Sequence, residues 1–102
     1  MKIVLVCFAG MSTSMLVSRM EKVAIKRGIE ADIIAIPATE IYDEAEDADV
    51  ILLGPQARYT LDEVKKFASP YKIPVDVIDS RIYGMMDGEA VLDMALELIS
   101  NK

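Results

Sequence analysis

Residues 3–14 read IVLVCFAGMSTS, an uninterrupted apolar run, Ile3–Cys7, followed by a turn rich in small and hydroxyl-bearing residues. A short run that is apolar throughout is typical of a strand buried on both faces of a parallel sheet. The next segment, Ser12–Arg27, has apolar side chains at intervals of three and four, which predicts a helix closed by Gly28. A buried strand that leads through a short turn into a helix is the start of an α/β fold.

The rest of the chain repeats this alternation of strands and helices. Three further strands are expected, over Ala31–Ile36, Val50–Leu53 and Val75–Ile78. Three further segments are expected to be helical, the first a short acidic helix or turn: Thr39–Ala48, Thr60–Ala68 and Gly88–Ile99.

The polar residues within the strands predict their order. The first and third strands are wholly apolar, whereas the second and fourth carry Asp32 and Asp76, which edge strands tolerate. We therefore expect a parallel sheet of order 2-1-3-4 in a single three-layer α/β domain over residues 1–102, with right-handed crossover helices on both faces. Ligands of such sheets bind beyond the carboxyl ends of the strands, where the winding reverses, and this point is Cys7.

Composition excludes several classes of function. The 102 residues carry a net charge of −6, so the overall field repels nucleic acids and anionic lipids. The chain has no histidine, which removes Cys–His and Ser–His–Asp catalysis and imidazole metal sites, and its one cysteine forms no internal disulfide. No apolar run approaches the ~20 residues of a membrane span, and no signal peptide is visible. We expect a cytoplasmic monomer without membrane insertion, metal or cofactor, in which the acidic run Asp43–Asp49 is a solvated face.

The turn after the first strand is the candidate site. It combines a nucleophile, Cys7, with an anion-binding loop made of the seven residues that follow: Phe8, Ala9, Gly10, Met11, Ser12, Thr13 and Ser14. Backbone amides at a helix start bind anions, and the helix N-terminus favours a thiolate and a bound phosphate. One of the three hydroxyl residues is expected to cap the helix. The alternative is that Cys7 is only a small buried apolar residue next to an ordinary helix cap. The position of Cys7 where the winding reverses favours the interpretation that it is a nucleophile.

The arrangement of strand, cysteine, loop and helix resembles that of the low-molecular-weight tyrosine phosphatases, which use Cys-x5-Arg. Thr13 occupies the arginine position here, so the bidentate clamp on the phosphoryl oxygens is missing. No aspartate followed by proline is present to act as the phosphatases' general acid. A site with the nucleophile and loop alone is expected to hold phosphocysteine and pass the phosphoryl group on.

Three blocks resemble the IIB components of the phosphoenolpyruvate-dependent sugar phosphotransferase system, lactose/cellobiose/chitobiose class. They are the loop from Cys7 with Met15–Ser18 after it, the block Asp49–Gln56 with Tyr59, and the block Val75–Asp79 with Tyr83-Gly84 and Met86–Gly88. The resemblance covers essentially the whole chain.

The resemblance implies a sugar phosphotransferase with a phosphocysteine intermediate on a four-stranded parallel sheet. A phosphorylated histidine of a IIA protein donates to Cys7, and phosphocysteine then phosphorylates a disaccharide that the membrane-embedded IIC transporter imports. Lactose, cellobiose and diacetylchitobiose all remain open as the sugar. Two alternatives also stay open: a cysteine-dependent phosphatase or arsenate-reductase-like enzyme, and a non-catalytic anion-binding module.

Four more residues are expected at the carboxyl end of the sheet: Gln56, Tyr59, Asp79 and Tyr83. Each either lines the site, docks a partner or has only a structural role. For Asp79 a cap on the amides of a Ser80–Tyr83 loop is favoured, because a carboxylate would be repelled by phosphocysteine. Tyr83 is expected to pack over the anion-binding loop or to face a partner.

Two methionines near the loop are assigned different roles. Methionine side chains adapt to different surfaces, and a carrier must dock two partners in turn. Met11 is therefore the expected docking residue beside Cys7, whereas Met15 is expected in the core.

Overall fold

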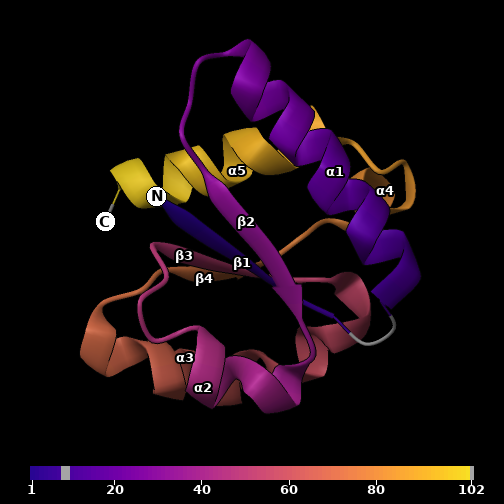
Figure 1. Ribbon diagram of the computed structural model, residues 1–102. Coiled ribbons are helices and arrows are strands. Elements are labelled where there is room, and N and C mark those ends of the chain that lie inside the picture. The colour runs from indigo at the N-terminus through magenta and orange to yellow at the C-terminus, as the bar shows by residue number, and fades with distance from the viewer. Residues whose placement is uncertain (8–9, 102) are drawn as a thin grey trace.

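The computed structural model describes residues 1–7 and 10–101, and only the backbone of residues 10–12. At its centre lies a parallel sheet in the order β2-β1-β3-β4 (Figure 1). The strands are β1 (Lys2–Val6), β2 (Asp32–Ile36), β3 (Val50–Leu53) and β4 (Val75–Val77). The order confirms the prediction: the strands that contain the wholly apolar runs, residues 3–6 in β1 and 50–53 in β3, form the centre, and the strands with aspartates form the edges.

Helices cover both faces of this sheet. The α-helices are α1 (Gly10–Lys26), α2 (Ile41–Glu44), α3 (Leu61–Ala68), α4 (Ser80–Gly84) and α5 (Gly88–Ser100). Three short 3-10 helices in the described part of the chain adjoin α2 and α3: η1 (Ala38–Glu40) precedes α2, η2 (Pro55–Thr60) precedes α3, and η3 (Ser69–Tyr71) follows α3. Helices α1 and α5 lie on one face, and α2 and α3 lie on the other (Figure 1).

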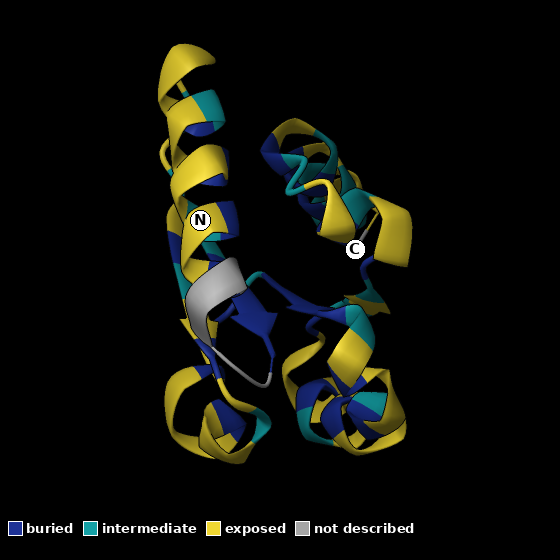
Figure 2. Ribbon diagram, turned by 90° about the vertical axis from the view of Figure 1, so that its right-hand side faces the viewer, coloured by how far each residue is buried: buried dark blue, intermediate teal, exposed yellow. Residues whose placement is uncertain are grey.

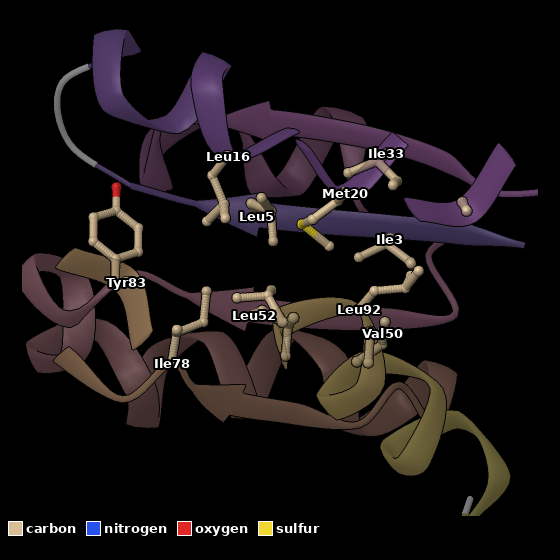
Figure 3. Close-up of a cluster of buried hydrophobic side chains, with 13 residues drawn as sticks. Ile3, Leu5, Leu16, Met20, Ile33, Val50, Leu52, Ile78, Tyr83 and Leu92 are labelled. Carbon is tan, nitrogen blue, oxygen red and sulfur yellow. The ribbon is translucent and has the colours of Figure 1, made fainter. Parts of the chain in front are cut away.

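Side chains of the central strands alternate between the two faces. Ile3 and Leu5 of β1 belong to an apolar cluster with α1 and α5, shown in Figure 3, whereas Val4 and Val6 belong to the cluster with α2 and α3. The helices are buried where they face the sheet and exposed on their outer sides (Figure 2). Continuing the alternation, Cys7 is the next residue that faces α1.

Two local expectations differ from the structure, and one agrees. The predicted loop at residues 80–83 is the short helix α4, because the Asp79 side chain caps its first amides. Helix α1 begins at Gly10, so the hydroxyl residues 12–14 lie inside the helix and none is its N-cap. Gly28 does end α1: it adopts φ +70° and donates its N–H to the carbonyl of Ile25 at 3.0 Å.

Within the described part of the chain, no helix has the length and apolar character needed to cross a membrane.

Candidate active site

Cys7 lies directly beyond β1, at the carboxyl end of the sheet. Its backbone N–H donates to the carbonyl of Ile36 at 3.1 Å, which extends the pairing of β1 with β2 by one residue. On its other side lies Gly54, the residue after β3, where a Cβ atom would lie 3.5 Å from the Cys7 Cβ and 3.4 Å from the Tyr83 ring. Cys7 as a whole is 8% exposed. Cys7, at the point where the winding reverses, therefore lies in a closely packed setting.

Two hydroxyl groups from separate helices meet at the Cys7 sulfur. Thr13 of α1 donates its hydroxyl to Cys7 Sγ at 2.8 Å, and its Oγ1 lies 3.2 Å from the Tyr83 hydroxyl oxygen of α4. Both side chains are buried, and Figure 3 shows the Tyr83 hydroxyl pointing toward the end of β1. The residue that replaces the phosphatase arginine thus contacts the sulfur itself. Tyr83 packs over the site, which was one of its two expected placements.

The surroundings of Cys7 act on the pKa of its thiol in opposite directions. Burial raises the pKa of the thiol, and hydrogen bonds from Thr13 and then Tyr83 lower it by less, so the net pKa lies above the ordinary thiol value. The direction of this shift opposes the stabilisation of a Cys7 thiolate that is expected from the helix N-terminus. Desolvation outweighs the groups that favour the charged form.

The other predicted residues divide into those near Cys7 and those with a structural role. Gln56 places its Oε1 3.0 Å from the Cβ position of Gly54, at the exposed edge of the site. Tyr59, also in η2, is 69% exposed. Asp79 Oδ1 accepts from the amides of Arg81 and Ile82 at 2.8 and 3.4 Å, which agrees with the capping role predicted for it.

Part of the predicted loop has no described side chains. Phe8 and Ala9 lie outside the described residues, as do the side chains of Met11 and Ser12. Gly10 starts α1, and Ser14 is exposed on that helix.

Met15 corrects another prediction, since it is 52% exposed rather than in the core. The face of α1 that meets the sheet is set by Thr13, Leu16 and Met20, and Met15 lies about 100° away from Leu16 around the helix.

Gly54 was missed as a site residue. Its role is to leave room, because a side chain there would contact Gln56, Tyr83 and Cys7 together. A glycine that ends a buried strand often marks a close approach of other groups, and this signal was available in the sequence.

The reactivity of Cys7 is expected to depend on pH according to this balance. Because the thiolate is the nucleophile, alkylation by iodoacetamide should reach half its maximal rate at a pH above the ordinary thiol pKa. The folded protein binds the thiol proton more tightly than the unfolded chain does. The free energy of unfolding should therefore fall as the pH rises from the ordinary thiol pKa to the raised pKa of the folded protein. Tyr83→Phe removes one pKa-lowering hydrogen bond and should move the alkylation profile to still higher pH.

Tyr42→Phe is the matched control for that profile. The Tyr42 hydroxyl donates to Glu63 at 3.1 Å on the α2–α3 side of the sheet, away from Cys7. Its removal should leave the alkylation profile unchanged. A profile centred at or below the ordinary thiol pKa in the wild-type protein would contradict the balance described here.

Comparisons with known proteins cover nearly the whole chain. Residues 2–94 match the family model of the lactose/cellobiose-specific IIB subunit of the PTS system. The oligo-beta-mannoside-specific EIIB component of Bacillus subtilis is 42% identical, over 99% of this chain and 98% of the relative. The cellobiose-specific EIIB component of Lactococcus lactis is also 42% identical, over 96% of this chain and 95% of the relative.

Solved structures share the fold. The cellobiose-specific IIB component of Borrelia burgdorferi has a TM-score of 0.83 at 44% identity, over 100% of this chain and 94% of that chain. The lactose-specific IIB domain of Streptococcus pneumoniae has a TM-score of 0.86 over 96% of each chain, and at 20% identity it supports the fold alone. With these matches, the chain belongs to the lactose/cellobiose-specific IIB family and is a sugar phosphotransferase component that works with IIA and IIC partners.

Proposed function

We propose that Cys7 is the phosphoryl-carrying residue of this IIB component. The observation that carries the proposal is the buried sulfur at the end of β1, which accepts a hydrogen bond from Thr13 at 2.8 Å beside the Tyr83 hydroxyl. The donor is a phosphohistidine of the IIA partner, and the acceptor is a hydroxyl of a cellobiose-, chitobiose- or lactose-type disaccharide in the IIC transporter. The protein acts as a cytoplasmic monomer that meets the membrane only through IIC.

The first transfer forms an S–P bond and breaks an N–P bond. The Cys7 sulfur attacks the phosphorus of phosphohistidine, in line with the leaving nitrogen. The thiol proton ends on the imidazole nitrogen that has lost the phosphoryl group, so a neutral thiol enters and a neutral imidazole leaves. This balance accounts for a nucleophile whose pKa is raised and which has no histidine in its own chain to act as base.

The second transfer reverses these changes at sulfur. A sugar hydroxyl oxygen attacks phosphorus, an O–P bond forms and the S–P bond breaks, and the hydroxyl proton is returned to the sulfur. The hydroxyl of Thr13, already 2.8 Å from Sγ, donates to the sulfur as negative charge develops on it. Tyr83 supports Thr13 from the other side at 3.2 Å.

The residues around Cys7 favour a carrier over a phosphatase. The arginine position of the phosphatase loop holds Thr13, which binds the sulfur rather than clamping phosphoryl oxygens. The carboxylate on the neighbouring loop, Asp79, accepts from two backbone amides and serves as a helix cap. The contacts described around Cys7 therefore supply neither an arginine clamp nor a general acid for rapid hydrolysis of phosphocysteine.

The proposed docking edge consists of Met11, the docking residue predicted from the sequence, and four exposed residues: Met15, Gln56, Tyr59 and Met85. Met15, Tyr59 and Met85 are each more than half exposed.

Met11→Glu should slow phosphorylation of Cys7 by IIA several-fold, because a carboxylate placed beside the reacting centre repels the incoming phosphoryl group. The rate of phosphorylation is measured by quenched-flow labelling. Ile25→Glu, an exposed position at the far end of α1, is the control. Equal rates for Met11→Glu and wild type would remove Met11 from the docking edge.

One reconstitution separates the candidate functions. The protein is incubated with phosphoenolpyruvate, the general phosphotransfer proteins and IIA, and then with IIC-containing membranes and each candidate disaccharide. A carrier passes label to the sugar and leaves an aryl phosphate intact. Hydrolysis of the aryl phosphate without transfer would indicate a phosphatase, and neither activity would indicate an anion-binding module.

A further inference from the structure

The hydroxyl pair at Cys7 is assembled from two helices that are far apart in sequence. Thr13 comes from α1 and Tyr83 from α4, and their oxygens lie 3.2 Å apart. Helix α4 has only five residues, Ser80–Gly84, so its own backbone hydrogen bonds fix its position poorly. Asp79 holds the start of α4. The end of α4 must be held by contacts with another element.

Arg19 of α1 provides such a contact. Its Nη1 atom donates to the carbonyl oxygens of Met86 at 3.2 Å and Met85 at 3.4 Å, the two residues that follow α4. Met86 has φ +53°, a left-handed conformation that is uncommon outside glycine. The N–H of Met86 donates to the carbonyl of Tyr83 at 3.0 Å, so this turn is bonded directly to the tyrosine.

The backbone after the turn meets α1 at the same residue. A Cβ atom on Gly88 would lie 2.7 Å from the carbonyl carbon of Arg19 and 2.8 Å from the backbone nitrogen of Met20. The chain therefore crosses α1 in direct backbone contact, and the Arg19 guanidinium binds the turn just before that crossing. Two independent contacts thus converge on one position of α1.

We propose that Arg19 is a positioning residue, whose guanidinium holds the Met85–Met86 turn against α1 and so sets the place of the Tyr83 hydroxyl beside Thr13 and Cys7. Arg19 has no contact with the sulfur among those described, and it acts through Tyr83. The consequence for phosphoryl transfer rests on the proposed function of Cys7, whereas the consequence for thiol reactivity does not.

A double-mutant cycle tests this proposal. The alkylation rate of Cys7 is measured across pH for wild type, Arg19→Ala, Tyr83→Phe and the double variant. Arg19→Ala should slow alkylation at neutral pH about threefold, as expected for weakening one hydrogen bond to the thiolate. In the Tyr83→Phe background, Arg19→Ala should have no further effect, because its route to Cys7 has been removed. Equal effects of Arg19→Ala in both backgrounds, or no effect in either, would overturn the proposal.

Two further variants separate positioning from charge and from folding. Arg27→Ala removes a cation from the same helix, one that binds Asp93 at 2.6 Å and Glu89 at 3.6 Å on α5, and should leave Cys7 alkylation unchanged. Arg19→Lys keeps the charge and one donor, folds if Arg19→Ala does not, and should retain most of the wild-type rate. A loss in Arg19→Lys as large as that in Arg19→Ala, or a change as large in Arg27→Ala, would contradict the proposal.

This readout needs neither a partner nor phosphate. If Cys7 cannot be phosphorylated but the cycle shows coupling, the proposed function fails and the positioning role stands. If Cys7 is phosphorylated and the two substitutions act additively, the positioning role fails alone.

Discussion

Cys7→Ser is expected to abolish relay of the phosphoryl group to sugar, with a loss on the order of a thousandfold or more, as for removal of other enzyme nucleophiles. Serine fits the same buried space and accepts the Thr13 hydrogen bond that Sγ accepts at 2.8 Å. Its hydroxyl is far less acidic than a thiol, however, and its phosphate ester is a poorer donor. The steady-state rate of sugar phosphorylation in the reconstituted system measures the loss.

Two controls show that the serine variant fails in chemistry alone. Its thermal unfolding midpoint should stay close to that of the wild type. The substitution replaces one atom, sulfur, by oxygen, which can also accept the hydrogen bond from Thr13. It should also compete with wild-type protein for phosphorylated IIA, since the docking edge is unchanged. Relay at the wild-type rate would refute the role given to the sulfur.

Gly88→Ala is expected to lower the free energy of unfolding by about 1–3 kcal/mol, the usual range for overpacking. The added methyl group would lie 2.7–2.8 Å from backbone and Cβ atoms of Arg19 and Met20. Since most of these atoms are backbone, α1 and α5 must separate, and the loss of packing extends along their apolar contact. Urea unfolding of both proteins, followed by circular dichroism, measures the difference.

Gly84→Ala is the matched control. No atom of a described residue, outside its chain neighbours and its own helix, lies within 4 Å of a Cβ placed at Gly84. Because alanine is favoured over glycine in a helix, this variant should be unchanged or more stable by up to about 1 kcal/mol. Equal stability of the Gly88 and Gly84 variants would show that the crossing of α1 and α5 is not tightly packed.

The order of the strands could be read from the sequence because burial on two faces leaves a clear pattern. A central strand of a parallel sheet is apolar over its length that is buried on both faces, whereas Asp32 and Asp76 indicate edge strands. The strand order also predicts where the candidate site lies. The winding reverses between the two central strands, and Cys7 directly follows the first of them. The blocks that resemble the IIB family include the loop after β1 and the strands β3 and β4.

Features that depend on distant contacts could not be predicted in this way. Helix α4 is too short to show a helical period, and only the Asp79 cap signals it. The contact between Thr13 and Tyr83 joins residues 70 apart in sequence. The raised pKa of Cys7 reflects a competition between burial and hydrogen bonding, and the sequence shows the groups without showing which effect is larger. Arg19 looks like any other exposed helix residue until the turn at Met86 is placed beside it.

The most direct measurement is to locate the phosphoryl group on the intact protein. The chain is labelled by phosphorylated IIA, digested at a pH that preserves phosphorothioesters, and mapped by tandem mass spectrometry, with ³¹P NMR of the undigested protein alongside. We expect one phosphoryl group, attached to Cys7 through sulfur and lost when sugar and IIC membranes are added. A phosphoryl group on Ser12, Thr13, Tyr83 or any other oxygen, with Cys7 unmodified, would contradict this expectation.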